Sequence, residues 1–203
     1  MSGNPRVAFF DAIAAKWDEW EDLPTLDARL AAGLVEIGLG PDETVLDVGC
    51  GTGNLTRAVL AKLSPTGRVI AVDIAPRMIE AARRKVTDPR VEWHVADASR
   101  PALADASVDR AICYSVWPHF DDPAAAASEL RRVLRIGGRF HVWHSIPRVR
   151  VNEIHASAGE PVRRDVLPPA AETARLLVAQ GFRVVAAIDD ADRYLVSAVK
   201  AAP

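Results

Sequence analysis

Short apolar runs alternate with segments of helical spacing over most of the chain, and this alternation predicts a sheet covered by helices. Seven runs fit strands, at 44–48, 68–72, 91–95, 108–114, 139–144, 182–188 and 193–199. Helical patterns lie between several of them, at 53–63, 76–86, 122–134 and 169–180. Strands separated by helices form right-handed crossovers and a parallel sheet. The acidic connection 189–192 between the last two runs instead indicates an antiparallel hairpin. We therefore expect an α/β fold, a doubly wound and mainly parallel seven-stranded sheet with helices on both faces and a C-terminal antiparallel hairpin.

Two helices are expected before the first strand. Residues 7–21 place apolar side chains three or four apart, which predicts an amphipathic helix, and Pro24 follows as a breaker. A second helix fits 25–37, and the first six residues are expected to be loose.

Residues 145–168 show no clear periodicity, and loops of this length in compact domains are usually functional or disordered. We expect one domain over residues 1–203. Within it, 1–40 would form a helical lid and 145–168 a loop insertion on the substrate side.

Composition narrows the function classes. The formal net charge of −2 gives no electrostatic reason to expect a nucleic-acid partner. No apolar run reaches the ~20 residues that a bilayer-spanning helix needs, and the start of the chain lacks a signal-peptide pattern. Two cysteines far apart in sequence form no disulfide framework, which favours a reducing cytoplasm. The expected partner is a small-molecule substrate, and assembly as a homodimer stays open.

The first strand ends in an acid, Asp47, followed by glycines at alternate positions, Gly49, Gly51 and Gly53. Glycines adopt backbone angles that side chains forbid, and they let a ligand approach the main chain closely. Dinucleotide-binding loops instead read G-x-G-x-x-G, and here Asn54 occupies the sixth position. An acid before the turn would oppose a pyrophosphate but suit a cationic ligand. The loop thus favours a ligand that carries positive charge and no phosphate.

The stretch Asp47-Val-Gly-Cys-Gly-Thr-Gly resembles the methionine-binding loop of class I methyltransferases, which use the sulfonium cation S-adenosylmethionine. The resemblance covers roughly residues 40–144 and the terminal hairpin. It implies that Asp73 binds both ribose hydroxyls and that Asp97 accepts from the adenine amino group. The cofactor site implied in this way consists of Asp47, Gly49, Cys50, Gly51, Gly53, Asp73, Ile74, Asp97, Ala98 and Tyr114, with Ile74 and Ala98 beside the adenine ring. No resident metal is implied.

Residues 9–20 resemble the opening helix of the ubiquinone/menaquinone-type branch of these enzymes. That likeness implies that Phe10, Trp17 and Trp20 cover the bound cofactor and substrate. The alternative is an amphipathic helix that simply packs on the sheet.

The end of the fourth strand is expected to line the methyl-transfer pocket, because ligands of open α/β sheets bind at the carboxyl ends of strands. Tyr114, Trp117 and Phe120 would make an apolar wall around a small molecule. The Asn/Asp-Pro-Pro-aromatic signature of family members that act on amino groups of nucleic acids or glutamine is absent here. Each aromatic residue taken singly could equally be packing.

Three histidines are candidates for a general base, His119, His144 and His155. Histidine titrates near neutral pH and could remove a substrate proton as the methyl group arrives. Alternatively, His144 and His155 could hold a metal with Glu153 or Asp165. His94 and His141 lie inside strands and are expected to be structural. The arginines of the long loop, Arg148, Arg150, Arg163 and Arg164, form either a solvated face or a site for a substrate carboxylate or phosphate.

The sequence therefore predicts methyl transfer from S-adenosylmethionine to a small-molecule acceptor, by in-line displacement in an aromatic-lined pocket. Because the methyl carbon is already activated by its positive sulfur, the protein mainly aligns the nucleophile and excludes water. Two alternatives stay open, a nicotinamide-dependent oxidoreductase and a non-catalytic module that binds S-adenosylmethionine.

Overall fold

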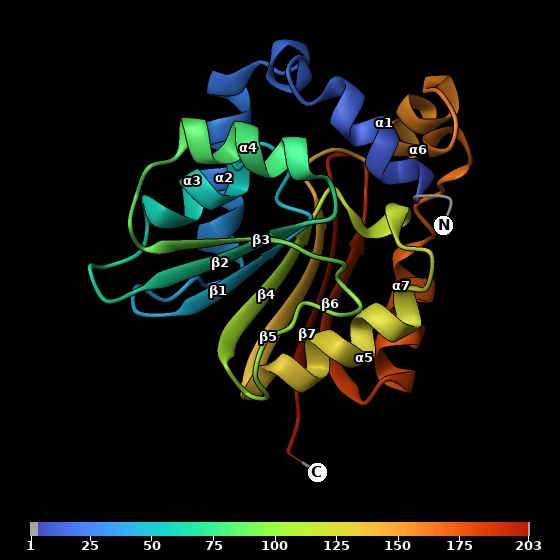
Figure 1. The fold of residues 1–203 in the computed structure, drawn as a ribbon. Helices are drawn as coiled ribbons and strands as arrows, with labels where there is room; N and C mark the ends of the chain where they lie inside the picture. Colours follow the sequence, from blue (N-terminus) through green and yellow to red (C-terminus); the bar gives the residue numbers. More distant parts are fainter. Residues whose placement is uncertain (1–3, 203) are drawn as a thin grey trace.

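The computed structural model describes residues 4–202, and its centre is a seven-stranded sheet in the order β3-β2-β1-β4-β5-β7-β6 (Figure 1). β1 to β5 run parallel, whereas β7 is antiparallel to both β5 and β6. The strands are β1 Thr44–Val48, β2 Arg68–Asp73, β3 Val91–Val95, β4 Val108–Tyr114, β5 Leu134–His144, β6 Phe182–Asp189 and β7 Tyr194–Lys200. This topology confirms the predicted fold class, including the antiparallel hairpin at the end.

Helices cover both faces of the sheet (Figure 1), and each face has its own apolar core. One face carries α2 Leu23–Glu36, α3 Asn54–Leu60 and α4 Pro76–Lys85, which bury side chains such as Leu34, Val59 and Ile79. The other carries α5 Pro123–Val133 and α7 Ala170–Ala179, which bury Leu130 and Leu177 against β5 and β7. Because both faces are covered, β1 and β4 are buried over most of their length, whereas β6 at the sheet edge alternates exposed and less exposed residues.

The register of the parallel strands brings their carboxyl ends together. Val48 of β1 pairs with Val72 of β2 and with Cys113 of β4, and Asp73 pairs with Val95 of β3. The residues that follow these strands therefore meet at one edge of the sheet, where α1 and α6 also lie (Figure 1).

The N-terminal segment differs from the expected single helix over 7–21. It forms α1 Pro5–Ile13 and then a separate 3₁₀ turn, η1 Trp17–Trp20. The break lets Asp18 accept hydrogen bonds from Lys85, Thr52 and Asn54, contacts that a continued α-helix would not position. Pro24 also does not end a helix, because it lies in the first turn of α2, where its missing N–H costs nothing.

The first six residues were expected to be loose, and this is wrong for the described residues among them. Asn4 caps α1 by accepting a hydrogen bond from the backbone N–H of Arg6, and Pro5 begins the helix. The prediction for residues 1–3 lies outside the described residues.

The long segment 145–168 contains a helix, α6 Arg148–Ser157, and a 3₁₀ turn, η3 Val162–Arg164. Its sequence gave no helical period because α6 buries only Val151 and His155. Other boundaries shifted by less: α3 ends at Leu60 rather than 63, and β5 begins at Leu134, before Gly137 and Gly138. No helix in the part of the chain that the structure describes is long and apolar enough to cross a membrane.

Candidate active site

The glycine loop follows β1 and forms one wall of a cavity at the carboxyl ends of the strands. Its glycines have φ of +67° at Gly49, +54° at Gly51 and +81° at Gly53, the left-handed region that favours glycine. A Cβ on Gly49 would lie 2.2 Å from Cγ2 of Val116, so only glycine fits there. A Cβ on Gly51 would meet no atom of the described residues within 4 Å, and Gly49 and Gly51 both line the cavity. The loop presents bare backbone to a ligand.

Asp73, at the end of β2, fixes this loop from the neighbouring strand. Its Oδ2 accepts a hydrogen bond from the N–H of Gly51 at 2.8 Å, and its Oδ1 accepts one from Ala75 at 2.8 Å. The side chain is buried yet reaches the cavity, and burial raises the pKa of its carboxyl. Since a carboxylate offers about four lone-pair positions, each oxygen keeps capacity to accept from a ligand hydroxyl.

The segment after β3 adds the third predicted acid. Because Asp73 pairs with Val95, Asp97 follows two residues later along the same edge of the sheet. Its Oδ1 accepts from the backbone N–H and the hydroxyl of Ser99, both at 2.8 Å. Ile74, Asp97 and Ala98 line the same cavity as the glycine loop. Six of the ten predicted cofactor residues thus line one cavity, namely Gly49, Gly51, Asp73, Ile74, Asp97 and Ala98.

Four predicted cofactor residues lie outside the cavity wall. Asp47 is buried behind the loop, where it accepts a hydrogen bond from the hydroxyl of Thr56 at 2.6 Å, and burial raises its pKa to about 7. Cys50 is buried among the side chains of the α2–α4 face. Gly53 is the residue before α3, and a Cβ on it would lie 3.2 Å from side-chain atoms of Ala82 and Trp93. These three residues support the loop from behind.

Tyr114 is the fourth, and its position corrects the expectation of an aromatic wall made by the end of β4. Its hydroxyl lies 2.6 Å from the hydroxyl of Ser145, and its ring packs edge-on against Trp143 at 4.8 Å. Trp117 is likewise buried in the core, 5.9 Å from the ring of Phe140. Of the three aromatic residues predicted there, Phe120 lines the cavity.

The N-terminal segment supplies other aromatic side chains. Phe10 and Trp17 line the cavity, with their rings 6.1 Å apart, and Phe10 also packs edge-on against His119 at 5.2 Å. Trp20 is 63% exposed, and it does not line the cavity, although its ring lies 6.2 Å from that of Trp17.

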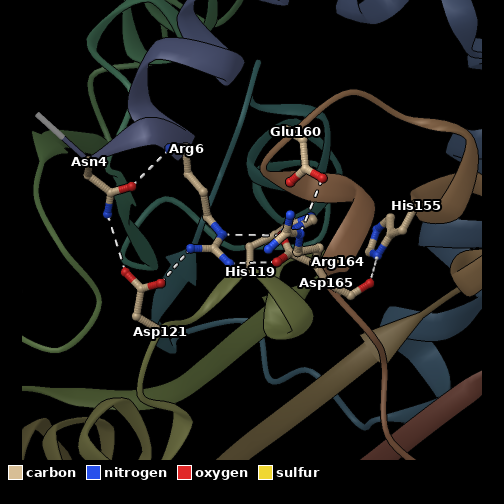
Figure 2. A network of polar contacts seen from close by, with 8 residues as sticks. All are labelled: Asn4, Arg6, His119, Asp121, His155, Glu160, Arg164 and Asp165. Carbon is tan, nitrogen blue, oxygen red and sulfur yellow. Dashed lines mark hydrogen bonds and ion pairs between the residues drawn. The ribbon is translucent and has the colours of Figure 1, made fainter.

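His119 is the one predicted base that lines the cavity within the described residues. Its Nδ1 lies 2.7 Å from Oδ2 of Asp165, an acid whose side chain is 3% exposed. A carboxylate accepts only, so Nδ1 carries a proton, and in the neutral imidazole Nε2 holds the lone pair. None of the residues that the structure describes hydrogen-bonds that Nε2. Figure 2 shows this pair with Arg6 beside it.

His155 and His144 lie behind His119, away from the cavity. Nδ1 of His155 is 2.8 Å from the backbone oxygen of Asp165, its ring is 4.8 Å from that of His119, and burial lowers its pKa (Figure 2). His144 is fully enclosed, and burial lowers its pKa to about 3. Its Nε2 has no hydrogen-bond partner among residues 4–202. Both imidazoles are therefore neutral at physiological pH.

The sequence reasoning missed Arg6, which lines the cavity from the first turn of α1. Its guanidinium forms ion pairs with Asp121, after β4, and with Asp165, after η3 (Figure 2). A lone arginine near a chain end gives no periodic or motif signal, so its partners become visible only in the fold.

Two alternatives were open for the long loop, a metal site and a site for a substrate carboxylate or phosphate. Within residues 4–202, no group of three or more histidine, cysteine, aspartate or glutamate side chains is placed to hold a metal ion. Three of the loop arginines form ion pairs away from the cavity, namely Arg148 with Asp189, Arg150 with Glu153 and Arg164 with Glu160.

Comparisons with known proteins agree with the predicted family of this domain. Residues 46–142 match a family model described as "Methyltransferase domain". Trans-aconitate 2-methyltransferase of Azoarcus sp. is 38% identical over 125 residues, which are 60% of this chain and 48% of that protein. Ubiquinone/menaquinone biosynthesis C-methyltransferase of Desulfotalea psychrophila is 29% identical over 143 residues, 68% of this chain and 58% of that protein. The chain spans about half the length of the curated relatives it matches.

A solved structure supports the fold. A SAM-dependent methyltransferase from Aquifex aeolicus superimposes with a TM-score of 0.71 at 24% identity, over 88% of this chain and 96% of that one. With the glycine loop and the acids at the ends of β2 and β3, these matches identify residues 46–142 as a class I S-adenosylmethionine-dependent methyltransferase domain, whose cofactor is S-adenosylmethionine.

Proposed function

We propose that this chain transfers the methyl group of S-adenosylmethionine to a small-molecule acceptor with the help of His119 as general base. One observation carries the proposal: a single cavity joins the glycine loop and Asp73 to His119, Phe10 and Trp17. Cofactor-binding backbone and a histidine with a free nitrogen thus face the same space.

The cofactor would lie on the side of Gly49, Gly51 and Asp73. The N–H groups and bare Cα atoms of the loop would receive its methionine part, and Asp73 would accept from the ribose hydroxyls. Asp97 would accept from the adenine amino group between Ile74 and Ala98. When bound, this cofactor supplies an electrophilic methyl group.

His119 would prepare the acceptor. Its Nε2 would take the proton from a hydroxyl, thiol or amine of the acceptor, and Asp165 would stabilise the imidazolium that results. Phe10 and Trp17 would exclude water from the cavity, which strengthens electrostatic interactions inside it.

The charges at the cavity favour an acceptor without a carboxylate. Arg6 is the one lysine or arginine among the described lining residues, and two carboxylates already neutralise its guanidinium. A carboxylate acceptor would therefore enter beside Asp121 without an available cation. The expected acceptor therefore differs from trans-aconitate, the carboxylate named for the Azoarcus relative.

The test has two stages. Isothermal titration with S-adenosylhomocysteine, with NADH as the comparison, should show binding of the former; NADH binding alone would favour the oxidoreductase alternative. A panel that pairs each phenol, thiol or amine with its carboxylate analogue should then show methyl transfer to the uncharged member. Cofactor binding without transfer to any acceptor would favour a non-catalytic module. Assembly as a homodimer stays a prediction for light scattering.

A further inference from the structure

The N-terminal segment reaches directly into the pair that would act as the base. Arg6 comes from the first turn of α1, whereas His119 follows β4 and Asp165 follows η3, so three distant parts of the chain meet here (Figure 2). The side chains of Arg6 and His119 are 18% and 10% exposed. Asp165 is 3% exposed, so the contacts that Arg6 and His119 make with it are largely shielded from solvent.

Arg6 donates hydrogen bonds to the Asp165 carboxylate from two nitrogens. Its Nε lies 3.2 Å from Oδ2 and its Nη2 lies 2.5 Å from Oδ1, while Nη1 bonds Asp121. Paired donors on a planar guanidinium fix both the position and the plane of a carboxylate. Oδ2 of Asp165 is also the atom that Nδ1 of His119 contacts, so Arg6 orients the acceptor of that hydrogen bond.

The charge of Arg6 matters as well as its shape. Burial works against an ionised Asp165, but the hydrogen bonds from His119 and Arg6 outweigh it and lower the pKa of Asp165. The other titratable groups that act on His119 or lie against it are His155, His144 and Asp73, and neither histidine carries charge at neutral pH. Arg6 is thus the cation that offsets Asp165 beside the imidazole.

We propose that Arg6 is a positioning residue for methyl transfer, which holds Asp165 so that His119 keeps its proton on Nδ1 and turns a basic Nε2 to the cavity. The base is then complete only while α1 is seated. This inference rests on the proposed function.

The structure offers a clean way to separate this role from docking of α1. Without Arg6, the segment keeps the bond from the backbone N–H of Arg77 to Asp11 and the ion pair between Asp18 and Lys85. Arg6→Gln should therefore leave α1 in place. Arg6→Lys restores a charge without the paired donors, and Arg163→Gln removes an exposed arginine from the same loop as Asp165.

Long-range ¹⁵N–¹H NMR of the ligand-free protein reads the tautomer of His119 without any activity. We expect wild type, Arg6→Lys and Arg163→Gln to hold the Nδ1–H form, and Arg6→Gln to show a mixture of both tautomers. An unchanged tautomer in Arg6→Gln would overturn the proposal.

Kinetics give the second readout. In Arg6→Gln we expect kcat to fall about tenfold or more, the acidic limb of the pH–rate profile to move to higher pH, and S-adenosylhomocysteine affinity to stay within about twofold. Arg6→Lys should return the acidic limb of the pH–rate profile toward its wild-type position.

An acidic limb that stays at its wild-type position in Arg6→Gln would contradict the proposal. If wild type does not bind S-adenosylhomocysteine, the proposed function is wrong. The NMR result is independent of that outcome, because it is measured on the ligand-free protein. Should Arg6→Gln not fold, Arg6→Met, which is of similar length but has neither charge nor donors, carries the test. A wild-type tautomer and an unmoved acidic limb in Arg6→Met would refute the role of Arg6.

Discussion

Nδ1 of His119 and Oδ2 of Asp165 lie 2.7 Å apart, on two segments 46 residues apart in the chain. The aspartate fixes which ring nitrogen is protonated, and the ring belongs to a residue that lines the cavity. An imidazole oriented in this way is ready to accept a proton, whereas an unoriented one spends part of its time in the wrong tautomer.

Replacing the base should affect turnover much more than binding. His119→Gln should lower kcat by about 100-fold or more, the usual contribution of general-base catalysis, and leave S-adenosylhomocysteine affinity nearly unchanged. Steady-state kinetics with a methyl acceptor and calorimetry check the two parts. His94→Gln, on β3 and outside the cavity, is the control. His155→Ala should cost less than His119→Gln because His155 does not line the cavity; equal losses would argue against His119 as the base.

Removing Asp73 should weaken cofactor binding. Asp73→Ala loses the acceptor proposed for two ribose hydroxyls and the bond to Gly51, so S-adenosylhomocysteine affinity should fall at least about tenfold, or 1.4 kcal/mol. Titration calorimetry measures this, and thermal denaturation checks that the variant is folded. Asp192→Ala, in the exposed hairpin turn, should bind like wild type. Unchanged affinity in Asp73→Ala would contradict the placement of the cofactor.

Acid should destabilise the fold through His144. Its folded pKa is lowered to about 3, whereas the unfolded chain titrates near 6.5. Because the unfolded state binds more protons between these values, stability present above pH ~6.5 is lost as the pH falls toward 3, at up to about 1.4 kcal/mol per pH unit. Urea denaturation from pH 7.5 to 5 measures the slope. His144→Phe keeps a ring against Tyr194 and should flatten it; an identical slope would refute this account.

Asp47 should make binding depend on the charge of the cofactor's sulfur. Burial raises the pKa of Asp47 to about 7, so ionisation increases between pH 6 and 8 and favours a cation above the loop. The affinity for S-adenosylmethionine should therefore rise from pH 6 to 8 more than the affinity for S-adenosylhomocysteine, whose sulfur is uncharged. Calorimetry at both pH values checks this. Asp47→Asn keeps an acceptor for Thr56 and should abolish the difference; a difference that persists would exclude Asp47 as its source.

Local patterns predicted the fold well and the site only in part. Strand periodicity and the turn residues gave the sheet, and Asp73 and Asp97 follow strands whose register is set by the parallel pairing. Tyr114 and Trp117 were misplaced because the sequence shows that a residue follows β4 but not which face its side chain takes.

The contacts around the base depend on long-range folding. Arg6 and Asp165 are 159 residues apart, and neither lies in a motif or on an amphipathic stripe. Their meeting requires α1 and η3 to reach the same edge of the sheet, which no local pattern encodes. The same holds for α6, whose few buried residues left no helical period in the sequence.

The segment that carries Phe10 and Trp17 is fastened near its two ends by ion pairs, Arg6 with Asp121 and Asp165, and Asp18 with Lys85. The Arg6–Asp121 and Asp18–Lys85 pairs are partly exposed, and such pairs contribute about 1 kcal/mol or less each and weaken as salt screens them. Release of the spent cofactor should therefore accelerate with ionic strength, so that the concentration of simple salt would set how long each product molecule stays bound.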